Sequence, residues 1–135
     1  MQTHSKATIL LVEDDPDVRD AVADILEEHG YRVVTANNGE EALKHLQQEK
    51  LRPSIVLLDL MMPVMDGWQF REIQKNDPAI SDIPVIALTA HLELRSVDAV
   101  AHLRKPLALD LLLETVALVS SSSRLQRAAF NEPRK

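Results

Sequence analysis

The sequence predicts an α/β domain in which helices cover both faces of a parallel β-sheet. Apolar segments of strand length alternate along the chain with segments whose apolar residues recur at helical spacing. Residues 54–58 have no polar alternation, which is typical of a strand buried on both faces of a parallel sheet. The length of 135 residues and the apolar content of 45% suit one compact domain.

The first strand is predicted over residues 8–12, and a helix follows it. Asp15 is a suitable N-cap, Pro16 occupies the first helical position, and Gly30 lies just beyond the last turn. Apolar residues recur between these signals at helical spacing, namely Val18, Ala21, Val22, Ile25 and Leu26. Residues 31–36 form the second predicted strand.

The second helix is predicted over residues 38–48. Asn38 and Glu41 are spaced like a capping box. The apolar face of this helix consists of Ala42, Leu43 and Leu46. After the third strand, a third helix begins at Asp66 and stops before Asp77, because the proline that follows disfavours helical conformation in the residue before it.

The fourth and fifth strands are predicted over residues 84–88 and, more weakly, 100–103. The crossover between them is close to the lower limit of about 10 to 12 residues. A fourth helix, over about residues 92–99, is therefore expected to be irregular or to have at most two turns. With the last helix, the prediction comprises five strands and five helices in strict alternation.

The last helix is predicted over residues 107–120 and is apolar on more than one face. One stripe consists of Leu109, Leu112, Val116 and Val119, while Leu107, Leu111 and Leu118 lie off it. The extra leucines have two interpretations, either packing against both the sheet and a neighbouring helix, or an exposed surface for a partner. A homodimer through this helix is one form of the second interpretation.

Beyond this helix, the domain of residues 1–120 is expected to end in a Ser-rich and basic segment. Four serines at 120–123 precede residues 124–135, which contain four basic residues and the single acid Glu132. We predict that residues 121–135 are a disordered tail or the stub of a linker. They are too few for a DNA-binding output domain, so the chain is either a stand-alone domain or part of a longer protein.

Composition excludes several classes of function. The formal charge of −6 argues against a nucleic-acid surface over the whole molecule. The absence of cysteine excludes disulfides, thiolate catalysis and Cys-ligated zinc. The polar N-terminus has no signal-peptide pattern and no apolar run reaches membrane-spanning length, so we expect a cytoplasmic protein without membrane contact.

Polar side chains collect at the carboxyl ends of the predicted strands, where a parallel sheet places its ligand site. They are Glu13, Asp14 and Asp15 after the first strand, Asp59 after the third, Thr89 after the fourth and Lys105 after the fifth. Carboxylates about 4 Å apart repel by roughly 4 kcal/mol at an effective dielectric constant near 20, so the acids require a cation. Oxygen ligands without nearby His or Cys favour Mg²⁺.

These residue types together suit phosphoryl transfer to a carboxylate. A metal ion on one side, the Lys105 ammonium on the other and the Thr89 hydroxyl would enclose a site of phosphate size. Asp59 between them can attack phosphorus and become an aspartyl phosphate. Alone, Asp59 has a simpler interpretation as a turn acid and Lys105 as a solvated charge, but their shared position at the strand ends favours the site.

Five short sequence blocks resemble the signature of response-regulator receiver domains, over about residues 7–120. The blocks are ILLVEDDP at 9–16, LLDLMMP at 57–63, MDG at 65–67, ALTA at 87–90 and RKP at 104–106. The resemblance implies a flavodoxin-like fold with strand order 2-1-3-4-5. It also implies a phosphoprotein that receives its phosphoryl group from a sensor histidine kinase or a phosphotransfer protein, catalyses only its own phosphorylation and dephosphorylation, and signals to a downstream protein target.

The resemblance also implies roles for the acidic residues. Asp59 corresponds to the phospho-acceptor, and Glu13 and Asp14 correspond to the acidic pair that binds Mg²⁺. In receivers with Glu first in that pair, the second acid usually touches the metal and the first acts through water. Asp14 is therefore the expected direct ligand, the backbone carbonyl of Met61 corresponds to a further ligand, and Asp15 is expected to cap the helix.

Lys105 resembles the phosphate-binding lysine, and its bond to Pro106 is a candidate cis peptide, against a background of about 5% for X-Pro bonds. Thr89 resembles the switch hydroxyl. The segment from Thr89 to Lys105 is about six residues shorter than in most receivers, and His102 stands where most have an aromatic switch residue. His102 is either a pH-sensitive switch or a half-buried or solvent-facing residue of a short edge strand.

Three other functions fit the sequence less well. A phosphatase of the haloacid-dehalogenase type requires a second acid two residues after the nucleophile, and Met61 occupies that position. A flavin-binding domain would place the cofactor phosphate where the acids lie. An interaction module that no longer uses phosphorylation is favoured by the short fourth helix and His102, but such a module has no physical reason to keep mutually repelling acids.

Overall fold

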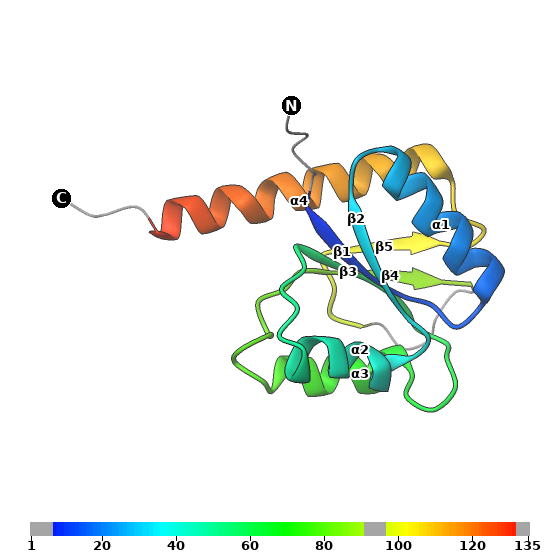
Figure 1. The fold of residues 1–135 in the computed structure, drawn as a ribbon, viewed down its shortest axis with the longest axis horizontal. Coiled ribbons are helices and arrows are strands. Elements are labelled where there is room, and N and C mark those ends of the chain that lie inside the picture. The colour runs from blue at the N-terminus through cyan, green and yellow to red at the C-terminus, as the bar shows by residue number, and fades with distance from the viewer. Residues whose placement is uncertain (1–6, 91–96, 132–135) are drawn as a thin grey trace.

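The structure, a computed structural model, describes residues 7–90 and 97–131 of the chain. Five parallel strands form one sheet in the order β2-β1-β3-β4-β5 (Figure 1), which confirms the predicted doubly wound, flavodoxin-like fold. The strands are β1 Thr8–Val12, β2 Arg32–Ala36, β3 Ile55–Asp59, β4 Val85–Thr89 and β5 Ala101–Arg104. Their bounds differ from the predicted ranges by one residue at most.

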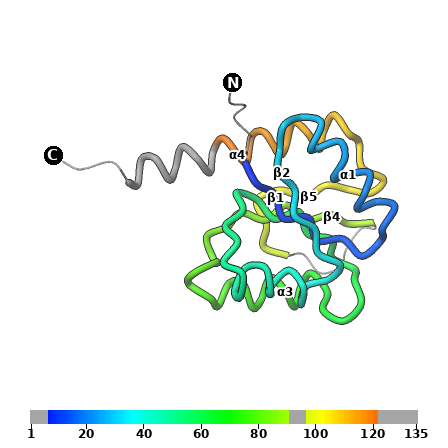
Figure 2. Tube along the Cα trace, in the orientation of Figure 1, coloured from blue at the N-terminus to red at the C-terminus, as the bar shows by residue number. Residues whose placement is uncertain are grey.

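Helices cover both faces of the sheet. On one face lie α1 (Pro16–Glu28) and α4 (Leu109–Asn131), and on the other lie α2 (Gly39–Leu43) and α3 (Gly67–Lys75), as Figures 1 and 2 show. A π-helical turn, η1 (Lys44–Gln48), continues α2. The second predicted helix therefore exists over its full predicted length but changes its hydrogen-bond pattern halfway along.

Successive side chains of a strand point to opposite faces of the sheet, which divides the core into two layers. In β1, Ile9 and Leu11 belong to the cluster that contains buried residues of α1 and α4. Leu10 and Val12 point to the opposite face and join the cluster that contains Phe70 of α3. All five side chains are fully buried. Burial on both faces explains why residues 9–12 of this strand include no polar side chain.

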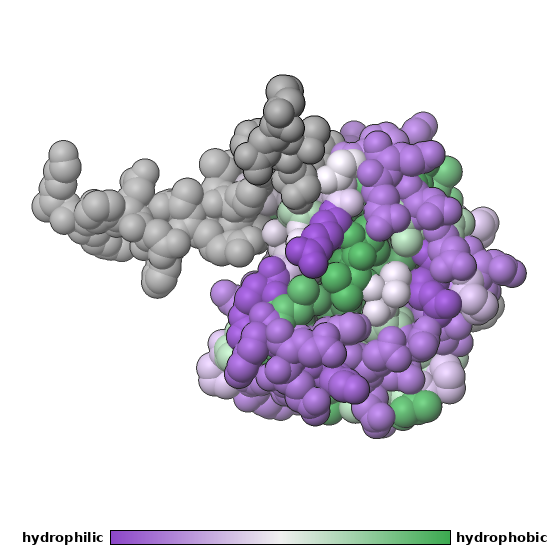
Figure 3. Space-filling view, in the orientation of Figure 1, coloured by the Kyte–Doolittle hydropathy of each residue, from purple (hydrophilic) through white to green (hydrophobic). Residues whose placement is uncertain are grey.

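The outer surface is largely polar. Figure 3 shows apolar side chains gathered over the edge strand β2, where Val33 and Val34 are partly exposed, with polar side chains around them. In the described part of the chain, no helix combines the length and the apolar character needed to cross a membrane.

The helix ends follow the predicted capping with one difference. Asp15 accepts hydrogen bonds from two backbone N–H groups in the first turn of α1, and Gly30 beyond its end has a φ of 92°. Asn38 accepts from the backbone N–H of Glu41 at 2.9 Å. The Glu41 carboxylate, however, accepts from the backbone N–H of Asn37, one residue before the cap, so the predicted capping box is not reciprocal.

The predicted fourth helix falls mainly on residues 91–96, which lie outside the described residues. Residues 97–99, which are described, are not helical. The backbone N–H of Val100 then donates to the carbonyl of Val85 at 2.9 Å, which brings the chain back to the sheet. The described residues thus show four α-helices rather than the predicted five.

The last helix differs from its prediction at both ends. It begins at Leu109 rather than at residue 107, and it continues through the four serines to Asn131. The serines are a weak stop signal, because serine costs a helix only about 0.5 kcal/mol relative to alanine. No glycine or proline occurs between positions 107 and 132 to end the helix earlier. The assignment of residues 121–135 to a tail or linker remains a prediction.

The apolar stripe of this helix is confirmed except at its start. Leu112 and Val116 are fully buried, and Val119 packs against the same cluster. Leu109 is 48% exposed, contrary to the prediction. Leu107, just before the helix, packs against the cluster in its place.

The loop between β3 and α3 contains a tight turn centred on Val64. The backbone N–H of Met65 donates to the carbonyl of Pro63 at 2.8 Å, and Val64 between them has a φ of 69°. A β-branched residue rarely adopts a positive φ, and such strain costs of order 1–3 kcal/mol. The Val64 side chain is 72% exposed, so packing offsets little of this cost.

Replacing Val64 with glycine is therefore expected to stabilise the fold. Glycine relieves the strain but adds freedom to the unfolded chain, so the free energy of unfolding should rise by about 0.5–1 kcal/mol. Urea denaturation of the wild type, V64G and V64A measures this, because alanine shortens the side chain and keeps most of the strain. A glycine variant no more stable than the alanine variant would contradict the strain at this position.

Candidate functional site

The two central strands bring the acidic residues together. Val12 pairs with Leu58, so Glu13, one residue later, lies beside Asp59, the last residue of β3. Carboxylate oxygens of Glu13, Asp14 and Asp59 all lie within 4.8 Å of one another. Glu13 and Asp59 are 0% and 4% exposed, whereas Asp14 lies nearer the solvent. The structure thus gathers three predicted site residues in one acidic cluster.

Lys105 completes the cluster from the loop after β5. Its Nζ lies 2.7 Å from Oε1 of Glu13 and 3.4 Å from Oδ2 of Asp59. The backbone N–H of Lys105 donates to the carbonyl of Thr89 at 2.7 Å, and the bond to Pro106 is cis. The ammonium therefore lies between two buried carboxylates and neutralises one of their charges.

Burial raises the pKa of Asp59 to about 7, and a hydrogen bond with Glu13 and repulsion from its charge act in the same direction. The Lys105 ammonium and the backbone N–H of Met61 lower this pKa but compensate only in part. Burial alone would lower the pKa of Lys105, yet the contacts with Glu13 and Asp59 raise it above its usual value. The cluster therefore favours binding one more positive charge, a proton or a cation, near neutral pH.

A glycine allows α3 to start directly against the end of β3. The backbone N–H of Gly67 donates to the carbonyl of Leu60 at 3.0 Å. A Cβ at position 67 would lie 2.7 Å from Cα of Leu60 and 2.9 Å from the carbonyl oxygen of Asp59, closer than real Cβ contacts. In the loop that joins β3 to α3, the backbone N–H of Met61 donates to Oδ1 of Asp59 at 3.3 Å. The role of the Met61 carbonyl as a metal ligand remains a prediction.

The two predicted switch residues lie on the neighbouring strands β4 and β5. Leu88 of β4 pairs with Asp59 of β3. Thr89, the next residue and the last of β4, therefore lies at the same edge of the sheet as the acidic cluster. His102 is an exposed residue of the edge strand β5, and its Nε2 lies 3.1 Å from the carbonyl oxygen of Val97. The solvent-facing interpretation of His102 matches this position, and both switch roles remain predictions.

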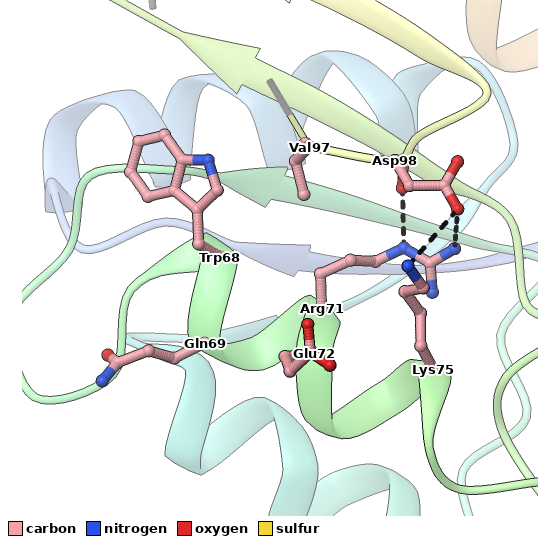
Figure 4. A pocket seen from close by; sticks show the side chains of 7 residues that line it. All are labelled: Trp68, Gln69, Arg71, Glu72, Lys75, Val97 and Asp98. Carbon is pink, nitrogen blue, oxygen red and sulfur yellow. Dashed lines mark hydrogen bonds and ion pairs between the residues drawn. The ribbon is translucent and has the colours of Figure 1, made fainter. Parts of the chain in front are cut away.

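A pocket of about 410 Å³ lies between α3 and the segment before β5 (Figure 4), and neither the acidic cluster nor Lys105 lines it. Trp68 and Val97 line it, and Arg71 reaches across to Asp98. Nε of Arg71 donates to the carbonyl of Asp98 at 2.7 Å, and Nη2 lies 3.5 Å from its carboxylate. These contacts attach the short β4–β5 connection to α3. Sequence patterns gave no sign of them, because the partners lie 27 positions apart.

The donor set of the acidic cluster fits a hard cation. Each of its three residues offers a carboxylate oxygen, and no nitrogen or sulfur ligand takes part in this group within the described chain. Mg²⁺ is usually held by one or two carboxylates together with water and phosphate. One lysine cannot balance three carboxylates, so a divalent ion would complete the neutralisation of this site.

Comparison with known proteins identifies a family of receiver domains and regulatory proteins that are similar to this chain. Residues 9–117 match the family described as response regulator receiver domain. The positive alginate biosynthesis regulatory protein of Pseudomonas aeruginosa is 39% identical over 134 residues, which cover 93% of this chain and 52% of that protein. The transcriptional regulatory protein GlrR of Escherichia coli is 42% identical over 123 residues, which cover 84% of this chain and 26% of that protein.

Two solved receiver structures match this chain over nearly their whole length. The signal receiver domain of a signal transduction histidine kinase from Syntrophus aciditrophicus has 33% identity and a TM-score of 0.79, covering 86% of this chain and 91% of that chain. The chemotaxis response regulator CheY4 of Vibrio cholerae has 30% identity and a TM-score of 0.75, covering 85% and 99%. The chain therefore spans about half or less of the two curated relatives but almost all of these two structures.

The raised pKa of Asp59 is expected to make stability depend on pH. The pKa of about 7 in the folded state lies above the ordinary value of 3.8, so between these values the folded form binds more protons than the unfolded form. The free energy of unfolding should therefore fall as the pH rises from about 4 to about 7, and level off above. Denaturant titrations without divalent cations measure this slope.

The matched control for this measurement is D59N, because asparagine cannot ionise. Its pH dependence over the same range should be clearly weaker than that of the wild type. Equal slopes in the two proteins would mean that groups other than Asp59 cause the dependence.

Proposed function

Because the chain belongs to the response regulator receiver domain family, we propose that Asp59 accepts a phosphoryl group from the phosphohistidine of a sensor histidine kinase or a phosphotransfer protein. The reaction depends on Mg²⁺, and the phosphorylated domain signals through altered binding to a downstream protein target. The observation that carries this proposal is the position of Asp59, buried at the end of β3 between the Glu13 carboxylate and the Lys105 ammonium.

Asp59 supplies the nucleophile for this transfer. One of its carboxylate oxygens attacks phosphorus, the bond between phosphorus and the histidine nitrogen breaks, and the electron pair leaves with the imidazole. The pKa of about 7 leaves a fraction of Asp59 protonated at neutral pH without a metal. A bound Mg²⁺ supplies positive charge that favours the ionised nucleophile and offsets charge on the transferred oxygens.

Glu13 and Asp14 would hold the metal, with the Met61 carbonyl as a further ligand. Receiver domains bind Mg²⁺ at an acidic pocket, and the cluster of Glu13, Asp14 and Asp59 has that character. Asp14 is the proposed direct ligand, because its greater exposure suits an ion that keeps several waters. Glu13 is already engaged by Lys105 at 2.7 Å, which suits an indirect role through water.

Lys105 would change partner when Asp59 is phosphorylated. The new group adds a charge of about −1.5 to −2 and three acceptor oxygens, which compete with Glu13 for the ammonium. Thr89, at the neighbouring strand end, would donate its hydroxyl to the same group. His102 on the adjacent strand β5 is the second proposed switch residue, and its exposed ring suits a pH-sensitive contact with a target.

The domain would act on itself rather than on a separate substrate, promoting its own phosphorylation and dephosphorylation. The two curated relatives are regulators that extend well beyond the part matched by this chain, so their outputs do not define its target. The excess of 21 acidic over 15 basic residues supports a protein target rather than nucleic acid or an anionic membrane. A cytoplasmic location is proposed because histidine kinases use cytoplasmic ATP.

The exposed side of α4 is proposed as a surface for a second copy of the chain. Leu111 and Leu118 are 50% and 67% exposed, so these two leucines fit the interpretation of an exposed surface. They lie seven residues apart and therefore on one side of the helix, away from the buried Val116. Apolar residues at this spacing are typical of helices that pair along their length.

Incubation with phosphoramidate and Mg²⁺ is expected to add about 80 Da to the wild-type protein, the mass of one phosphoryl group. Intact-mass spectrometry in acid measures the adduct, and peptide mapping locates it. D59N should lack the adduct, and chelation of Mg²⁺ should prevent it in the wild type. An unmodified wild type would favour the alternative of an interaction module that does not use phosphorylation.

Sedimentation velocity with and without beryllofluoride, a mimic of the phosphoryl group, tests the dimer. A faster-sedimenting species is expected with the mimic, and L118E should remove it because a charge would be buried at the seam. L109E is the matched control, since Leu109 is also exposed but lies on another side of α4. A wild type that stays monomeric in both conditions would rule the dimer out.

A further inference from the structure

Arg19 of α1 joins the loops that follow the first two strands. Its Nη1 donates to the backbone carbonyl of Glu13 at 3.4 Å and to the side-chain oxygen of Asn37. Glu13 is the residue whose buried carboxylate belongs to the acidic cluster, and Asn37 lies in the loop between β2 and α2. The Arg19 side chain is only 19% exposed, so it is packed against these loops rather than extended into solvent.

The contact matters because Glu13 lies beyond the last strand pair. The ladder between β1 and β2 ends at Val12 and Ala36. After that pair, the backbone N–H of Glu13 donates to the carbonyl of Ala36 at 3.0 Å, and the Glu13 carbonyl accepts from Arg19. Arg19 therefore fixes the peptide that joins Glu13 to Asp14, the two acids on this side of the cluster.

The second acceptor of Arg19 is itself held in place. The backbone N–H of Asn37 donates to Oε1 of Glu41 at 3.1 Å, and its side-chain amide nitrogen donates to Oε2 at 3.3 Å. With its nitrogen turned toward Glu41, the Asn37 amide presents its oxygen to Arg19. The guanidinium thus ties the Glu13 peptide to a loop that is anchored on α2.

We propose that Arg19 is a positioning residue for Mg²⁺ at the acidic cluster, an inference that rests on the proposed function. By holding the Glu13 carbonyl, it sets the direction in which the Glu13 and Asp14 side chains leave the backbone. Both bonds come from Nη1, which the planar guanidinium holds in a fixed direction, whereas the shorter lysine carries a freely rotating ammonium on a flexible stem. Residues that orient metal ligands typically contribute 10- to 100-fold in metal affinity.

The positive charge of Arg19 is expected to weaken Mg²⁺ binding, whereas its positioning role is expected to strengthen it. A cation near the acids repels Mg²⁺, so loss of this charge alone would tighten binding. The two effects can therefore be separated by their sign. R19K keeps the charge and removes the planar guanidinium, and R19Q removes both.

Calorimetric titration of Mg²⁺ into the wild type, R19K and R19Q tests the positioning role. R19K is expected to bind Mg²⁺ about tenfold more weakly than the wild type. R19Q is also expected to bind more weakly, but by a smaller factor, because it loses the repelling charge as well. D20N is the matched control, because Asp20 pairs with Arg19 at 3.8 Å but its side chain is 75% exposed, and its affinity should stay within about twofold. Tighter binding by R19Q together with unchanged binding by R19K would overturn the inference in favour of a charge effect.

The phosphorylation rate with phosphoramidate gives a second readout. In R19K the Mg²⁺ concentration for half-maximal rate should rise about tenfold, while the rate at saturating Mg²⁺ stays within about twofold of the wild type. A variant that unfolds more easily but keeps the wild-type dependence on Mg²⁺ would show a merely structural role and overturn the inference.

D14N separates failure of this inference from failure of the proposed function. A wild type that does not bind Mg²⁺, or a D14N protein that binds it equally well, would overturn the proposed metal site and the positioning role with it. Loss of binding in D14N with unchanged binding in R19K and R19Q would overturn the positioning role alone.

Discussion

Two carboxylates buried side by side are the constraint around which this domain is arranged. Parallel strands end at one edge of the sheet, so the residue after β1 and the last residue of β3 cannot be separated without breaking the sheet. Glu13 and Asp59 meet there with almost no access to water, where like charges repel strongly. The Lys105 ammonium, the close contact at Gly67 and the Arg19 bond to the Glu13 carbonyl all hold neighbouring groups around this pair.

Local patterns predicted what depends on neighbours along the chain. The apolar runs located the strands, the Asp15 cap and Gly30 bounded α1, and the strand ends identified the acids, because each signal acts within one element or at its end. Contacts between distant positions were not predictable in this way. The closer approach of Lys105 to Glu13 than to Asp59, and the anchoring of the Arg19 guanidinium on Asn37, depend on packing that no spacing in the sequence encodes.

The chemistry and the unusual features of the chain occupy different parts of the sheet. The acids lie at the ends of β1 and β3, which have neighbouring strands on both sides, whereas the short connection leads into the edge strand β5. Arg71 attaches that connection to α3 through Asp98 rather than to the acidic cluster. A shortened β4–β5 connection is thus compatible with an intact cluster, because the Lys105 backbone still bonds to Thr89 and its ammonium still reaches Asp59.

The close contact between β3 and α3 also gives the chain an internal optical probe. Gly67 lies against the backbone of the proposed acceptor Asp59, and the next residue, Trp68, is the single tryptophan of the protein. Its indole is partly buried beside Val97, at the start of α3. Tryptophan emission, excited at wavelengths that Tyr31 does not absorb, therefore originates at one known place, one residue from the Gly67 backbone that lies against Asp59.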